Sequence, residues 1–287
     1  MKKITTLLLI LLATSVGFSQ EDERPDNTGD NFSLEGALAL FKKSNSLEEF
    51  EKLLNEENNN VNNLDLNDDN DIDYIMVDDI REGDTHAIVL STYVNDKEKQ
   101  DIAIIGIEKT GNESATLQIE GDADLYAENT FVEPNEVVES STGGKGGPSI
   151  SEITTKQVIV NVWFWPNVRF LYAPTYVVWH SPWRWGFYPK WWRPWRPYKY
   201  HIFYNRCAPH RVYYHSVPAR RVVVAHKIYA PRRNHSTLVV HNNRRTTVVK
   251  SNNRKTTVVT KNKRGDVKAV RVKKSSPTRV RTSGGRR

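Results

Sequence analysis

Several features that would point to a reaction are scarce in this sequence. The chain of 287 residues has one cysteine, Cys207, which excludes an intramolecular disulfide and a cysteine-based zinc site. After the first twenty residues, no apolar run is long enough to cross a bilayer. The Gly-x-Ser-x-Gly motif, nucleotide-binding glycine-rich motifs and cysteine–histidine patterns are also missing. The sequence therefore favours a protein that is not an enzyme.

Acidic residues are almost missing from the second half of the chain. Residues 141–287 contain 31 Lys and Arg against only Glu152 and Asp266, whereas residues 21–140 contain 8 against 32 Asp and Glu. The net charges of these two ranges are +29 and −24, and together with Lys2 and Lys3 they give the overall charge of +7. This change of sign predicts a domain boundary and a polyanionic partner for the basic half. The alternative is that the two halves neutralise each other, within one chain or between copies.

Residues 1–19 have the pattern of a secretory signal peptide. Two lysines precede an apolar run over residues 4–13, and Gly17 and Ser19 place small residues before a cleavage site at Gln20. No cysteine stands at that site, so the signal is not that of a lipoprotein. The predicted location is the periplasm, the outer cell surface or the medium, without a transmembrane segment after cleavage.

The acidic half is expected to hold a flexible leader, residues 20–31, and an α+β module, residues 32–132. Ser33 can cap a first helix, and Ser46 with Glu49 forms a capping box for a second. Four runs rich in Ile, Val and Tyr follow, separated by short polar turns: residues 74–80, 86–94, 101–108 and 115–120. This spacing predicts an antiparallel β meander with the helix pair packed on one face.

The basic half is expected to be less regular. Residues 133–149 form a Gly-rich linker, and proline recurs every few residues after Pro166. Because proline removes hydrogen-bond donors and fixes φ, long helices are excluded, and residues 150–235 are predicted to form an irregular Trp/Tyr/Pro-rich all-β region. Residues 236–287 form a basic tail that repeats every ten residues as Thr-Val-Val strands. This tail is expected to be partly disordered.

An acidic stretch before the meander carries oxygen donors at alternate positions. The candidate ligands are Asp65, Asn67, Asp69, Asp71 and Asp73. A hard cation such as Ca²⁺ needs six to eight oxygens, which alternate residues of a tight loop can supply. Asn70 takes the place of the usual turn glycine and tolerates the left-handed conformation. The alternative is an acidic, solvated turn between helix and sheet.

The same stretch resembles the calcium loops of dockerin-type, EF-hand-like and thrombospondin type 3 modules. The resemblance covers about ten residues and implies that Asp71 supplies its carbonyl and the other four residues their side chains. It implies a structural Ca²⁺, bound weakly with a Kd of ~10⁻⁴–10⁻³ M, as in extracellular modules.

All eight tryptophans lie between Trp163 and Trp195, interleaved with arginine and proline. Arginine stacks on aromatic faces and binds phosphate, sulfate or carboxylate through its planar fork. This composition suits an anionic glycan or another envelope polyanion, with nucleic acid as a secondary candidate. The alternative is that the tryptophans are core, and we expect a buried majority with an exposed cationic rim. The rim residues are Arg184, Lys190, Arg193, Arg196 and Lys199.

A wider resemblance covers most of the mature chain. It is carried by Leu64-Asp65-Leu66-Asn67, Asp73-Tyr74-Ile75, Val162-Trp163-Phe164-Trp165-Pro166, Tyr172-Ala173-Pro174, Val177-Val178-Trp179, Ser181-Pro182-Trp183-Arg184-Trp185 and Trp192-Arg193-Pro194-Trp195-Arg196-Pro197. With an acidic module before these segments and a basic Thr/Arg/Val tail after them, the chain resembles a group of uncharacterised secreted proteins of Gram-negative bacteria. The resemblance implies a secreted location and no activity.

Three functions are compatible with this sequence. The first is non-enzymatic binding of an anionic surface polymer, or organisation of the cell envelope, with a calcium loop that stabilises the acidic module. The second is self-association, in which acidic and basic halves of different copies pair and tail strands add edge to edge. The third is hydrolysis of an envelope glycan by carboxylates of the acidic module that face the tryptophan-rich residues 163–204, which we call the aromatic block.

Overall fold

The computed structural model describes residues 25–140, 152–156, 159–243, 246–252, 255–261 and 267–273. The predicted signal peptide and the glycine-rich end of the predicted linker, residues 141–149, lie outside these ranges. Among the described residues, no helix is both long enough and apolar enough to cross a membrane.

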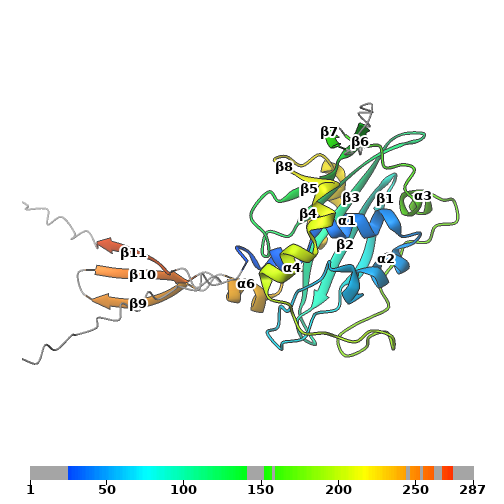
Figure 1. The fold of residues 1–287 in the computed structure, drawn as a ribbon. Helices are drawn as coiled ribbons and strands as arrows, with labels where there is room; N and C mark the ends of the chain where they lie inside the picture. The colour runs from blue at the N-terminus through cyan, green and yellow to red at the C-terminus, as the bar shows by residue number, and fades with distance from the viewer. Residues whose placement is uncertain are drawn as a thin grey trace, which may run out of the picture.

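A six-stranded antiparallel sheet lies at the centre of the fold (Figure 1), in the order β1-β2-β3-β4-β5-β8. The strands are β1 (Met76–Glu82), β2 (Thr85–Tyr93), β3 (Lys99–Gly111), β4 (Ser114–Gly121), β5 (Phe131–Pro134) and β8 (Tyr214–Val217). Strands β1 to β4 follow one another along the chain and pair antiparallel. Together with several helices, this sheet confirms the α+β class.

The sixth strand comes from the second half of the chain. Strand β8 pairs with β5 in a register that places Val217 opposite Phe131 and Tyr214 opposite Pro134. The basic half therefore completes the sheet of the acidic half, which the change in net charge along the sequence did not predict.

Two helices cover one face of the sheet, the face turned toward the viewer in Figure 1. They are α1 (Leu34–Lys43) and α2 (Leu47–Leu54), and each is capped by the expected serine. Gly36 N donates to Ser33 Oγ at 3.0 Å, and Glu49 N donates to Ser46 Oγ at 3.1 Å. These caps satisfy backbone donors that have no partner within a helix. The helices bury their apolar sides against alternate strand residues such as Ile88 and Leu90.

The opposite face of the sheet is covered by α5 (Val223–Tyr229). Residues of β2 and β3 that point away from α1 and α2, such as Ala87 and Ile104, form a second core with Val222 and Ala225. Because side chains of a strand alternate between its two faces, this second cover explains why eight of the nine residues of β2 are buried.

The remaining elements are short. They are η1 (Thr28–Asn31), η2 (Glu57–Asn59), α3 (Pro166–Leu171), α4 (Tyr200–Arg206), η3 (Ala208–Val212), η4 (Ala230–Arg232), α6 (Thr237–Asn243), the hairpin β6 (Glu136–Ser140) with β7 (Glu152–Lys156), and the sheet β9 (Thr246–Asn252), β10 (Lys255–Lys261) and β11 (Val267–Lys273). Residues 159–235 therefore differ from the expected all-β region, since they contain three short α-helices and one strand. Proline stands in the first turn of α3, η3 and η4, where its missing N–H has no cost.

Ion pairs join the two oppositely charged halves. Arg220 Nε donates to Glu120 Oε2 at 2.8 Å, and Arg233 Nη2 donates to Asp122 Oδ1 at 2.7 Å. Arg221 lies 2.9 Å from Glu133. Each pair links the acidic sheet to the basic segment between β8 and α6. Part of the opposite charge of the two halves is thus neutralised within the chain, which was the alternative to a polyanionic partner.

Gly106 of β3 permits the close approach of α5. A Cβ at this position would lie 2.6 Å from Val222 Cγ2 and 2.8 Å from Ala225 Cβ. We expect Gly106→Ala to displace α5 and to lower the free energy of unfolding by about 1–3 kcal/mol, measured by urea unfolding. The control is Gly111→Ala in the same strand, where the nearest atom is 3.6 Å away. Equal effects of the two substitutions would contradict this account of the packing.

Candidate functional site

The aromatic block packs onto the acidic loop and the start of β1. The Ile72 N–H donates to the Trp195 carbonyl at 2.9 Å, and the Asp79 N–H donates to the Trp179 carbonyl at 2.9 Å. The Tyr74 ring lies edge-on to Trp192, with 5.1 Å between centroids. These contacts bring together the two stretches that the sequence had singled out separately.

Most of the tryptophan surface is covered. Trp165 and Trp192 are buried, and of all eight only Trp191, with 46% of its surface exposed, belongs among the exposed residues. The other five are half-buried. The tryptophans therefore serve mainly as packing against the acidic half, and Trp191 is the one that offers the most ring surface to a ligand.

The five residues of the expected cationic rim, Arg184, Lys190, Arg193, Arg196 and Lys199, are all exposed. Arg184 stacks 4.5 Å from the Phe187 ring centroid, and Arg193 Nη1 donates to the carbonyls of Lys190 and Trp192 at 2.7 Å. Within the described part of the chain, none of the five pairs with a carboxylate, in contrast to Arg220 and Arg233. Their charges face solvent, where an anionic ligand can reach them.

The expected calcium loop is a tight turn held by its own side chains. Asp65 Oδ2 accepts a hydrogen bond from Asn70 N at 2.9 Å, and Asp69 Oδ1 accepts one from Asp71 N at 2.9 Å. Asp68 and Asn70 have φ values of 60° and 69°, so Asn70 does adopt the left-handed conformation. Such side-chain to backbone bonds turn the loop sharply without glycine.

Asp73 differs from the other loop carboxylates because it is buried. Its Oδ2 accepts a hydrogen bond from Leu66 N at 2.7 Å. Burial raises the pKa of Asp73 well above its ordinary value, and the charges of Asp65 and Asp69 raise it further. Asn67 Nδ2 donates to Asp69 Oδ2 at 2.8 Å. In the described residues, no group of three or more His, Cys, Asp or Glu side chains is placed to hold a metal.

Glu51 is a functional candidate that the sequence analysis missed. It is 2% exposed, and three groups donate to its carboxylate: Tyr74 OH at 2.9 Å, Val77 N at 3.0 Å and Ser181 Oγ at 3.0 Å. It therefore ties α2 to β1 and to the aromatic block. Burial raises the pKa of Glu51 to about 7. The signal was present in the sequence, since Glu51 lies four residues after Leu47 on the buried side of the helix.

A second buried polar group lies between the sheet and the segment after α3. Asp79 Oδ2 lies 2.9 Å from His86 Nδ1 and accepts a hydrogen bond from Tyr176 OH at 2.8 Å. Asp79 is 1% exposed and His86 0%. Because a substrate cannot reach a group so deeply buried, its role is to fix the Tyr176 segment on the sheet.

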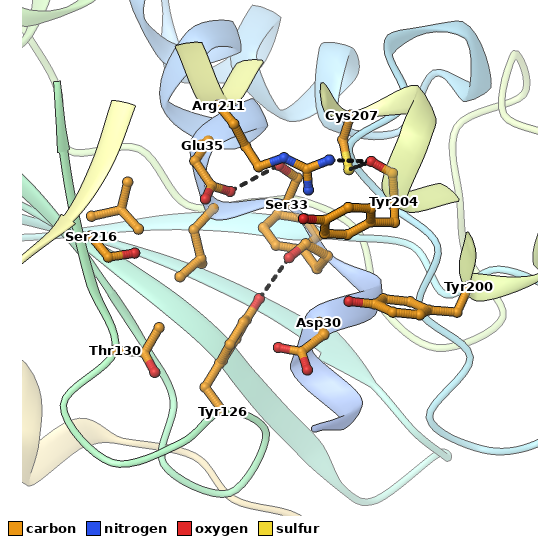
Figure 2. A pocket seen from close by; sticks show the side chains of 13 residues that line it. Asp30, Ser33, Glu35, Tyr126, Thr130, Tyr200, Tyr204, Cys207, Arg211 and Ser216 are labelled. Atoms are coloured by element: carbon orange, nitrogen blue, oxygen red, sulfur yellow. Dashed lines mark hydrogen bonds between the residues drawn. The ribbon is translucent and has the colours of Figure 1, made fainter. Parts of the chain in front are cut away.

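A cavity of about 230 Å³ lies between the beginning of α1 and α4, and Figure 2 shows the side chains that line it. Tyr200 and Tyr204 project into it from α4, opposite Glu35 of α1. The Arg211 guanidinium lies 3.7 Å from the Tyr204 ring centroid and donates to the Tyr204 carbonyl. This arrangement offers polar and aromatic contacts to a ligand. In the same lining, Ser33 Oγ donates to Glu35 Oε2 at 3.2 Å while it accepts the capping hydrogen bond from Gly36 N.

Cys207 lines the same cavity without being reactive. Its thiol is 3.2 Å from the Phe203 carbonyl, and the residue is 4% exposed. Burial raises the pKa of the Cys207 thiol above its ordinary value, so the nucleophilic thiolate is disfavoured. The cysteine acts as a small buried residue.

Comparison with protein-family models, with curated proteins and with solved structures finds no match for this chain. Function therefore has to be argued from the geometry described above.

The raised pKa of Glu51 predicts a pH-dependent stability. The folded pKa of about 7 exceeds the ordinary value of 4.5, so the folded state holds the proton more tightly than the unfolded state. The contribution of Glu51 to the free energy of unfolding is fully present below pH 4.5. It falls by ~3 kcal/mol as the pH rises to about 7. Glu51→Gln removes the titrating group, and we expect urea unfolding of this variant to depend less on pH across that window.

The matched control is Glu48→Gln, which changes an exposed glutamate on the same helix. Burial also raises the pKa values of Asp73 and Asp101. Both residues are unchanged in the two variants, so a difference in pH dependence between the variants comes from Glu51. The account fails if Glu51→Gln and Glu48→Gln retain the same dependence on pH.

Proposed function

We propose that this protein is a non-enzymatic, secreted or cell-envelope protein that binds an anionic surface polymer through the cationic rim. The observation that carries the proposal is that Arg184, Lys190, Arg193, Arg196 and Lys199 are exposed and without carboxylate partners in the described part of the chain. Basic side chains held in this way bind a polyanion without first breaking an internal ion pair.

The pairing of the other arginines supports the same choice. Arg220, Arg221 and Arg233 bind carboxylates of their own chain, which reduces the charge left for pairing between copies. Polyanion binding is therefore favoured over self-association through the two halves. The sequence of β9 to β11 adds six Lys and Arg residues.

The rim is backed by rigid packing. Trp192 contacts the Tyr74 and Tyr188 rings, at centroid distances of 5.1 and 4.8 Å, and it stands beside Arg193. Proline at positions 194 and 197 limits the backbone between the rim residues. A preordered cationic surface loses less conformational entropy on binding than a flexible one.

We further propose that the loop over residues 65–73 binds a structural Ca²⁺ through Asp65, Asn67, Asp69, Asp73 and the carbonyl of Asp71. Burial raises the pKa values of Asp65 and Asp73, and the charges of neighbouring loop carboxylates raise them further, so a cation in the loop would offset both effects. The Ile72 to Trp195 hydrogen bond links this loop to the aromatic block. Calcium would thereby stabilise the base on which the rim stands.

Polymer binding is tested with immobilised dextran sulfate across a salt series. We expect the full chain to bind with a steep salt dependence, and Arg184→Gln/Arg193→Gln/Arg196→Gln to bind more weakly. By analogy with phosphate contacts, the salt slope should fall by about one for each contact removed. The control variant Lys97→Gln/Arg169→Gln/Lys227→Gln removes the same charge from exposed positions elsewhere. Equal losses in both variants would show that net charge, and not the rim, determines binding.

Calcium binding is tested by thermal unfolding with added Ca²⁺. At about ten times Kd, Ca²⁺ should stabilise the fold by ~1.4 kcal/mol, and the gain should grow as the pH rises because protons compete for Asp73. Asp69→Asn should reduce the gain, while Asp96→Asn, at an exposed acidic position outside the loop, should not. A melting temperature that does not respond to Ca²⁺ would refute the site.

A further inference from the structure

A second cavity, of about 260 Å³, opens between helix α2 and the aromatic block. Trp179, Trp183 and Trp191 line one side, and Glu48 and Glu49 of α2 line the other. Drug-sized ligands usually occupy cavities of roughly 300–1,000 Å³, so this volume suits a small ligand. None of these residues belongs to the cationic rim or to the expected calcium loop.

A cation of the same chain already lies over one of the aromatic rings in the lining. The Lys52 ammonium lies 5.8 Å from the centroid of the Trp191 ring. The negative face of an aromatic ring attracts a cation at such distances, and tryptophan does so most strongly. Since Trp191 is 46% exposed, its ring also remains open to solvent. Lys52 therefore marks the ring face where a ligand cation would compete.

Carboxylates outnumber cations around the cavity. Glu48 and Glu49 outnumber the single lysine of the lining, and the buried Glu51, whose pKa burial raises to about 7, adds a third carboxyl group. Glu49 accepts hydrogen bonds from the backbone and side-chain amides of Asn45 at 2.8 and 2.9 Å, which lowers its pKa and keeps it ionised. The local charge therefore repels anions, in contrast to the rim.

The same lining also contains hydrogen-bond donors, since Trp179 Nε1 is buried without a hydrogen-bond partner among the described residues. Tyr74 OH donates to Glu51, and Ser46 Oγ accepts the helix-capping bond from Glu49 N. A sugar needs both donors and acceptors for its hydroxyl groups, whereas an alkylated ammonium group needs only aromatic faces and negative charge. The negative charge beside the aromatic faces therefore favours a hydrophobic cation, and a sugar is the competing ligand that the test has to exclude.

We propose that this cavity binds a small alkylated ammonium cation, with the Trp183 and Trp191 rings around the cationic group and Glu48 and Glu49 supplying the charge. The trimethylammonium group of choline has this chemistry. It can come from a soluble ligand or from a lipid headgroup. The proposal is independent of polymer binding, because the two sites share no residue.

The test is isothermal titration calorimetry of the full chain with choline. We expect saturable binding, and weaker binding by about threefold to thirtyfold for Trp191→Leu, which removes one aromatic face. Lys52→Met should strengthen binding, because it removes the competing internal cation and one positive charge. Phe187→Leu is the matched control, since this exposed aromatic residue lies outside the cavity lining.

The neutral analogue 3,3-dimethylbutan-1-ol has the shape of choline without its charge. We expect it to bind far more weakly than choline. Equal binding of the two compounds, absence of any saturable heat with choline, or binding of N-acetylglucosamine in preference to choline would overturn the proposal. Trp191→Leu could disturb folding, but Lys52→Met must change affinity in the opposite direction.

Vesicles of phosphatidylcholine distinguish the two sources of the cation. Binding of free choline together with Trp191-dependent binding to vesicles identifies a lipid headgroup, and binding of free choline alone identifies a soluble ligand. Vesicle binding that is unaffected by Trp191→Leu, without binding of free choline, would contradict the proposed site. Retention on dextran sulfate by the same Trp191→Leu protein shows separately whether the rim still functions.

Discussion

The requirement to bury both faces of the central sheet is the constraint on which the rest of the structure depends. Ile88 and Leu90 need a cover on one side, and Ala87 and Val89 need one on the other. The acidic half supplies only the first cover, through α1 and α2. The second cover is α5, which lies about 120 residues further along the chain than β3. The acidic half thus depends on the basic half for its core.

This dependence also determines which charges remain available. Arginines that lie beside the sheet, such as Arg220 and Arg233, are held by carboxylates on β4 and directly after it. The rim residues between Arg184 and Lys199 lie on the aromatic block, which meets the acidic half mainly through aromatic rings and backbone hydrogen bonds. The same packing therefore neutralises one set of basic residues and leaves another exposed. The proposed polymer surface is a product of this division.

Glu51 stands where the acidic module and the aromatic block join. Its carboxylate accepts hydrogen bonds from Val77 N of β1 and from Ser181 Oγ of the block, and Glu51 also belongs to the lining of the cavity over α2. The ligand proposed for the rim is an anion and the ligand proposed for the cavity over α2 is a cation, so the two proposals do not require competition for one ligand. A buried carboxylate with three donors holds such a junction in one geometry.

The sequence by itself determined the local features. Serine caps and apolar spacing located α1 and α2, β-branched runs located β1 to β4 within three residues, and the acidic turn at Asn70 followed from oxygen donors and asparagine. These depend on interactions between near neighbours. The tertiary structure decided which distant segments meet. It placed β8 at the end of the sheet and brought Ser181 Oγ to the buried Glu51 carboxylate. It also paired Arg220 with Glu120 and left Arg193 exposed. Such pairings are set by which distant segment covers each apolar face, and the composition of a segment does not specify its partner.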